Sequence, residues 1–133
     1  MMTIQVRWDN DAHTAVLVTF DGRFTWDEFE RAWGETTALY ETVDYPVDTI
    51  YDLRRIKVLP ANMVSYMRRR FPSRHPKGGL IAAVGLDKTM ALFWQTFTTL
   101  VAPHLKASFF DVPDEAREYL QQQRASAEVQ PGL

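Results

Sequence analysis

The spacing of apolar and polar positions in the first part of the chain predicts a β-hairpin, a helix and a third strand. Residues 3–8 alternate between apolar and polar, and residues 14–20 are β-branched and apolar, so we expect two paired strands. Thr25 is expected to cap the helix, because Glu28 follows three residues later as in a capping box. The helical spacing stops at a proline, and residues 47–53 are expected to form the third strand.

The middle of the chain continues with a helix, a turn and a strand. Pro60 suits the first turn of a helix, where its missing amide hydrogen is not needed. Three apolar residues at helical spacing form the expected buried side of this helix: Met63, Met67 and Phe71. Gly78 and Gly79 are expected to turn the chain into residues 80–84, whose continuous apolar run is typical of a central strand covered on both faces.

The last part of the chain adds two helices and a strand. We expect Asp87 to cap a helix, residues 106–110 to form a strand, and Asp111 to cap the final helix. Residues 125–133 are expected to be a flexible tail. The predicted order is ββαβαβαβα. Residues 1–124 are therefore expected to form one α/β domain with a mixed, mostly parallel five-stranded sheet and four helices.

The missing cysteines and the lack of a long apolar segment exclude several kinds of protein and site. The 133 residues include no cysteine, which excludes disulfides, thiolate nucleophiles and cysteine metal sites. Residues 1–10 lack the long apolar run of a signal peptide. The most apolar stretch, residues 90–102, is too short to cross a bilayer. We therefore expect a cytoplasmic protein without membrane insertion.

The net charge of −2 hides an uneven distribution along the chain. Residues 1–53 contain eleven acidic and three basic residues, whereas residues 54–77 contain eight basic residues and no acidic one. The candidate binding residues in this basic segment are Arg54, Arg55, Lys57, Arg68, Arg69 and Arg70. A solvated face that pairs with the acidic first helix and a site for an anion or acidic partner both stay open. Nucleic acid is not an expected partner, because the domain lacks excess positive charge and aromatic residues between the basic ones.

Asp52 and the first basic residues stand at the end of the third expected strand. Ligands bind beyond the carboxyl ends of strands in open α/β sheets, so Asp52, Arg55 and Lys57 are candidates for a ligand site. An ion-paired or loop-capping aspartate is the other interpretation of Asp52. The arginines at 68–70 come late in the second helix and are expected near the opposite end of the sheet.

The sequence contains no residue set with the spacing of a catalytic or metal site. His13, His75 and His104 are scattered over a turn and two loops. No serine stands in a G-x-S-x-G setting, and the glycine pair at 78–79 is not followed by the Gly-Lys-Ser/Thr of a phosphate-binding loop. We therefore expect no catalytic residue, no metal site and no cofactor.

Several short segments together carry a family resemblance. They are Phe20-Asp21-Gly22 before a capped helix, residues 49–53, Ala83-Val84-Gly85, and residues 109–111 with 114–117. In this order they resemble the STAS domain family, and in particular its SpoIIAA-like, STAS/SEC14-like branch, over roughly residues 3–122. The resemblance implies a mostly non-catalytic module. Anti-sigma-factor antagonists of the family bind a kinase-like partner and are switched by phosphorylation of a serine that opens the helix after the third strand. Residues 56–62 occupy that place and contain no serine or threonine, so we do not expect this switch.

The third expected helix is apolar on more than one face. One apolar stripe is formed by Met90, Phe93, Trp94, Phe97, Leu100 and Val101, and Ala91 and Leu92 extend it to a second face. Burial in the core would explain them. Alternatively, the outer edge forms a homodimer seam through residues 90–101, or covers an apolar pocket with Trp26, Phe29 and Trp33.

Two functions follow as expectations. The leading one is a non-enzymatic STAS-like interaction or regulatory module that binds a protein partner or itself. The alternative is a domain that binds a small anionic or lipid-like ligand, since the SEC14-like side of the resemblance includes lipid binders.

Overall fold

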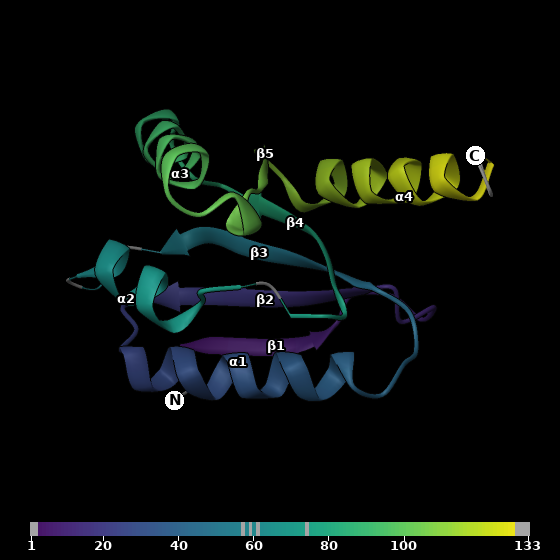
Figure 1. Ribbon diagram of the computed structural model, residues 1–133, viewed down its shortest axis with the longest axis horizontal. Coiled ribbons are helices and arrows are strands. Elements are labelled where there is room, and N and C mark those ends of the chain that lie inside the picture. Colours follow the sequence, from purple (N-terminus) through teal and green to yellow (C-terminus); the bar gives the residue numbers. More distant parts are fainter. Residues whose placement is uncertain (1–2, 57, 59, 61, 74, 130–133) are drawn as a thin grey trace.

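A five-stranded sheet forms the centre of the computed structural model, which describes residues 3–56, 58, 60, 62–73 and 75–129 (Figure 1). Its strands are β1 (Ile4–Trp8), β2 (Ala15–Gly22), β3 (Val47–Ile56), β4 (Gly78–Val84) and β5 (Ser108–Phe110). They lie side by side in chain order, with β1 antiparallel to β2 and the other neighbours parallel. The predicted α/β fold with a mostly parallel five-stranded sheet is confirmed.

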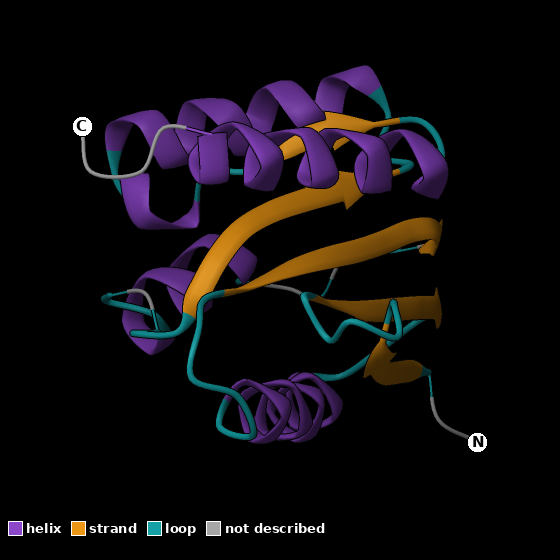
Figure 2. Ribbon diagram, turned by 90° about the vertical axis from the view of Figure 1, so that its right-hand side faces the viewer, coloured by secondary structure: helices purple, strands orange, loops and turns teal. Residues whose placement is uncertain are grey.

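Four helices within the described residues cover the sheet. They are α1 (Trp26–Tyr40), α2 (Met63–Arg70), α3 (Lys88–Leu100) and α4 (Pro113–Val129), with a 3-10 turn η1 (Pro103–Leu105) before β5. Helices lie on both sides of the sheet (Figure 2). Phe97 of α3 packs in one cluster with Phe71 after α2 and with Trp33 of α1, so these three helices share a face. Ala116 and Leu120 of α4 pack against the other face.

Alternation along the central strands decides the face on which each candidate residue lies. Tyr51 and Leu53 of β3 pack with the α1 cluster, whereas Ile50 packs with Ala82 on the α4 side. Asp52 follows the alternation of Ile50 and therefore lies on the α4 side.

Helix α1 begins as expected. The Thr25 side chain accepts a hydrogen bond from the amide of Glu28, and the Glu28 side chain accepts one from the amide of Thr25, which is the predicted capping box. The helix ends at Tyr40, before the proline that precedes β3.

The start of α2 differs from the expectation for Pro60. The helix begins at Met63, and Asn62 stands at its N-cap with φ 61°. A left-handed backbone cannot belong to a right-handed helix, so Pro60 lies outside it. The third strand is also three residues longer than expected and reaches Ile56.

Gly78 and Gly79 belong to β4 and do not form a separate turn, which corrects the expectation for them. Gly78 pairs with Val47 of β3. A Cβ at Gly79 would lie 2.3 Å from Oδ1 of Asp48, so the missing side chain lets the two strands approach. Only the second half of β4 is covered on both faces, because residues 82–84 are buried whereas Leu80 stays exposed.

Two boundaries near the end of the chain also differ. β5 begins at Ser108 because η1 occupies part of the segment before it. Helix α4 begins at Pro113, so Asp111 is not its N-cap residue, and the helix continues to Val129 through residues that were expected to start the tail. Residues 130–133 lie outside the described part of the chain. No helix within the described residues has the length and apolar composition needed to cross a membrane.

Candidate functional site

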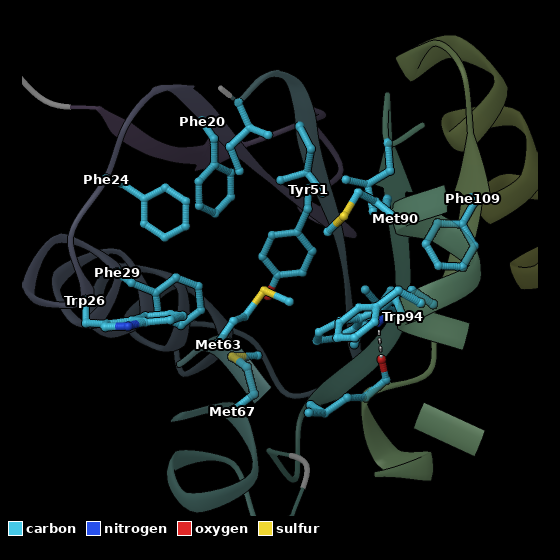
Figure 3. A pocket seen from close by; sticks show the side chains of 18 residues that line it. Phe20, Phe24, Trp26, Phe29, Tyr51, Met63, Met67, Met90, Trp94 and Phe109 are labelled. Atoms are coloured by element: carbon cyan, nitrogen blue, oxygen red, sulfur yellow. Dashed lines mark hydrogen bonds between the residues drawn. The ribbon is translucent and has the colours of Figure 1, made fainter. Parts of the chain in front are cut away.

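An apolar cavity lies between the sheet and helices α1, α2 and α3 (Figure 3). Its volume is about 150 Å³. The described residues that line it are Phe20, Phe24, Trp26, Phe29, Tyr51, Leu53, Ile56, Met63, Met67, Ile81, Ala83, Leu86, Met90, Phe93, Trp94, Leu105, Ala107 and Phe109. None of these residues carries a charge, so the cavity has the chemistry of a site for an apolar molecule.

The sheet forms the floor of the cavity. Tyr51 and Leu53 of β3, and Ile81 and Ala83 of β4, stand two residues apart on their strands and therefore point to the same face. Ala83 is 5% exposed, and its small side chain leaves space above the sheet that a larger one would fill.

Aromatic rings from the region of α1 form one wall. Phe24 meets Phe20 and Trp26 in edge-to-face contacts. The Trp26 ring stacks on Tyr66 of α2 with the ring centroids 3.9 Å apart. The Tyr66 hydroxyl in turn hydrogen bonds to Glu30 of α1. These contacts join α1 to α2 and fix the orientation of the rings.

Helices α2 and α3 form the opposite wall. Met63 and Met67 lie one turn apart on α2, and Met90 and Trp94 lie one turn apart on α3. The Trp94 indole donates a hydrogen bond of 3.2 Å to the carbonyl of Leu105, which holds this ring in place. The unbranched methionine side chains can adjust to the outline of an occupant.

Tyr51 is the polar residue of the floor. Its ring projects from β3 into the middle of the view in Figure 3, between the aromatic wall and Met90. Burial raises the pKa of the Tyr51 phenol well above its ordinary value, and the neighbouring Tyr40 adds to this effect. The hydroxyl therefore stays protonated.

A second, smaller cavity of about 70 Å³ adjoins the first. The two cavities share Phe29, Tyr51, Met67, Ile81 and Leu105 as lining residues. The lining of the smaller one also includes polar residues: Thr49, Ser73, His75 and His104. The space above the sheet therefore becomes more polar on the far side of Tyr51.

The structure shows where the apolar residues of α1 and α3 lie: some line the two cavities, some are buried in the core, and some are exposed. Trp26 and Phe29 line the main cavity together with residues of α3, and Trp33 lines the smaller one. Core burial accounts for Phe97 of α3. It does not account for the outer side of the helix, where Leu92, Phe93, Leu100 and Val101 are exposed.

Asp52 and Arg54 bind each other on the face opposite the cavity. The Arg54 guanidinium donates to both carboxylate oxygens of Asp52, with Nε–Oδ1 2.9 Å and Nη2–Oδ2 2.8 Å. The hydrogen bond from this side chain lowers the pKa of the Asp52 carboxyl below its ordinary value, against the opposing effect of burial. This geometry matches the interpretation of an ion-paired aspartate and does not place Asp52 at the cavity.

The other basic candidates do not form one site within the described residues. Arg55 is exposed and lies 3.9 Å from Asp21, while Lys57 lies outside the described residues. Arg68 and Arg69 are exposed on the last turn of α2. No described ion pair or hydrogen bond joins Arg54 or Arg55 to these helix residues.

Part of the basic segment pairs with α1. Arg70 contacts Glu30 at 2.8 Å, in the second turn of α1, and His75 and Lys77 contact Glu41 just after its end. Because α2 has only eight residues, Arg70 reaches the beginning of α1 and does not lie at the far end of the sheet. The ion pairs agree with the interpretation of a face that pairs with the acidic first helix.

The three histidines contact different groups, although His75 and His104 both line the smaller cavity. His13 stacks on Trp8, His75 lies beside Glu41, and the His104 ring contacts the carbonyl of Phe71. Within the described residues, no group of three histidine, aspartate or glutamate side chains is placed to hold a metal ion.

Comparison with known proteins adds no assignment. No family model matches the sequence, and no curated protein matches it significantly. The geometry of the cavity and of the exposed surfaces therefore carries the functional argument.

Sequence reasoning missed most of the cavity. Met63 and Met67 have the spacing of a buried helix side, and that spacing is the same whether a neighbour or an empty space lies opposite. The available signal was the apolar surface of the third helix on more than one face, which suggested a pocket covered together with Trp26, Phe29 and Trp33.

Proposed function

We propose that this domain binds a small apolar molecule in the cavity between the sheet and α1, α2 and α3. The observation that carries the proposal is a volume of about 150 Å³ lined by apolar and aromatic side chains. Apolar cavities of roughly this size stay dry and take up small apolar molecules, because their walls offer water too few hydrogen bonds. Binding would remove apolar ligand surface from water and so would be favourable.

The proposal favours a lipid-like ligand over an anionic one. The anionic alternative depended on Asp52, Arg54 and Arg55. Asp52 and Arg54 pair with each other on the opposite face of the sheet, and Arg55 is exposed beside Asp21. The apolar walls support the lipid-like alternative. We also propose that the domain is a non-catalytic, STAS-like module, and the element order supports the STAS-like part of this proposal.

Filling the floor of the cavity is expected to prevent binding. In Ala83→Phe the added ring would occupy the space above β4, so decane should bind at least about tenfold more weakly than to the wild type. The measurement is the rise in unfolding temperature at saturating decane, since a ligand that binds only the folded state stabilises it.

The control is Ala38→Phe, which adds the same ring to an exposed position of α1 and should leave the decane effect unchanged. Ala107→Phe fills the cavity from the segment before β5 and serves if Ala83→Phe does not fold. A wild-type protein that decane does not stabilise would contradict the proposed function.

A second function concerns the outer side of α3, which we propose as a contact surface for a second copy of the chain. Leu92 is 64% exposed and Leu100 is 77% exposed, two helical turns apart. The helix has no charged residue after Lys88, so two copies could meet around a twofold axis without placing like charges together. This surface supports the expectation of a self-associating module.

Charge on this surface is expected to keep the protein monomeric. Leu92→Glu and Leu100→Glu together should lower the mass measured by light scattering from that of a dimer to that of a monomer, because the contact would bury two carboxylates per chain. Val112→Glu changes an exposed apolar residue elsewhere and is the matched control. A monomeric wild type at high concentration would refute this second function.

A further inference from the structure

The hydroxyl of Tyr51 is open to the cavity. Three of the described lining residues have a side-chain oxygen or nitrogen: Trp26, Tyr51 and Trp94. The Trp94 nitrogen is engaged with Leu105, whereas no described residue hydrogen bonds to the Tyr51 hydroxyl. No side-chain oxygen or nitrogen sealed away from solvent lacks a partner among the described residues, so this hydroxyl borders the open space of the two adjoining cavities, both of which Tyr51 lines.

The hydroxyl can act as a hydrogen-bond donor to an occupant. Burial keeps the phenol of Tyr51 protonated, because its pKa lies above the ordinary value. A neutral phenol donates one hydrogen bond. An occupant with an oxygen near the Tyr51 hydroxyl would satisfy this donor, and a pure hydrocarbon would leave it unpaired.

The lining also decides the charge of the occupant. The described residues that surround the cavity provide no cation to pair with a carboxylate or a phosphate. An ionised group without a partner is costly to bury, far more so than a neutral carbonyl that receives a hydrogen bond.

We propose that the cavity selects neutral molecules with a carbonyl oxygen on an apolar skeleton, such as medium-chain ketones and esters, and that Tyr51 donates a hydrogen bond to that oxygen. The proposal rests on the proposed function of the cavity and names its ligand class. Tyr51 is then the residue that determines specificity, while the aromatic and methionine walls contribute the affinity.

The first test compares three probes of equal carbon number on the wild-type protein: decane, octyl methyl ketone and decanoate. Binding is followed by intrinsic fluorescence, because Trp26 and Trp94 line the cavity. At about pH 8 the ketone should bind at least roughly tenfold more tightly than decanoate, whose carboxylate is ionised. Decanoate binding should strengthen toward about pH 5, where the protonated fraction grows.

The second test is Tyr51→Phe, which removes the hydroxyl and keeps the ring. Ketone affinity should fall by about fivefold, the effect of one hydrogen bond, while decane affinity should not fall. Tyr119→Phe removes a hydroxyl on the α4 side of the sheet and should leave both affinities unchanged. Thermal unfolding of each variant checks that it is folded.

Each outcome separates the two proposals. If decane and the ketone bind equally and Tyr51→Phe changes neither, the ligand class is wrong although the cavity still binds apolar molecules. Decanoate binding at least as tightly as the ketone at about pH 8 overturns the neutral class. If none of the three probes binds, the proposed function itself fails.

Discussion

Replacing Arg117 by methionine is expected to lower the free energy of unfolding by about 1 to 2 kcal/mol, less than the loss for a fully buried ion pair, because the Arg117 side chain is 35% exposed. The guanidinium of Arg117 binds Asp9 at 2.7 Å, and the Asp9 side chain is only 4% exposed. Methionine would fill much of the same space but leave the Asp9 carboxylate buried without its partner. The loss is therefore the cost of an uncompensated charge.

The pair of Arg117 and Asp9 joins distant parts of the chain, so its loss should affect the stability of the whole domain. Arg117 lies on α4 and Asp9 follows β1, so the pair joins the two ends of the chain. Arg124, also on α4, forms a second ion pair with Asp48. It also donates hydrogen bonds to the carbonyls of Thr14 and Pro46. Loss of the Asp9 pair should loosen α4 from the hairpin, and loss of the Asp48 pair should loosen α4 from β3.

Denaturant titration followed by circular dichroism gives the free energy for Arg117→Met. Arg55→Met is the matched control, because its side chain is 76% exposed and its loss should change the stability by less than about 0.5 kcal/mol. Adding Asp9→Asn to Arg117→Met removes the stranded charge and should restore part of the loss. Equal stability of Arg117→Met and the wild type would show that the pair contributes nothing.

Gly85→Ala is expected to cost at least about 2 kcal/mol for two reasons that act together. Gly85 has φ +87°, which an L-residue with a side chain rarely adopts. A Cβ there would also lie 2.3 Å from Cγ and 2.8 Å from Cα of Arg54. The Arg54 backbone belongs to β3, so the clash cannot be relieved by a side-chain rotation alone.

The comparison variant is Gly34→Ala in α1, where a Cβ would have no atom within 4 Å. Alanine in a helix interior is more favourable than glycine by up to about 1 kcal/mol, so this variant should become more stable. Chemical denaturation should therefore give effects of opposite sign for the same substitution. A Gly85→Ala protein as stable as the wild type would refute the argument from backbone geometry.

The order of elements could be predicted because the local signals are strong. Thr25 and Asp87 both cap their helices by accepting a hydrogen bond from the amide three residues later. The predictions were wrong where a contact with a residue distant in the sequence determines the local backbone structure. Gly79 appeared to be a turn residue, but it is a strand residue whose missing side chain accommodates Asp48.

The candidate site could be predicted only in part. A carboxylate next to two arginines has the same sequence whether the groups bind a ligand or each other, and Asp52 and Arg54 bind each other. The pairs of Asp9 with Arg117 and of Asp48 with Arg124 were not predicted, because 108 and 76 residues separate the partners. Strand alternation places Tyr51 on one face of the sheet, but it does not show whether a neighbouring side chain or an empty space lies opposite, so the cavity volume does not follow from periodicity.

The consecutive order of the strands has a consequence for synthesis of the protein. Each strand can join the edge of the growing sheet as it leaves the ribosome, because its neighbour has already been made. The strands β3 and β4, which form the cavity floor around Tyr51, are synthesised before α3. The part of this apolar surface that α3 covers in the folded domain therefore stays exposed until α3 has been made. A nascent chain whose residues up to Val84 have left the ribosome before α3 has emerged would present this surface to chaperones or to other nascent chains.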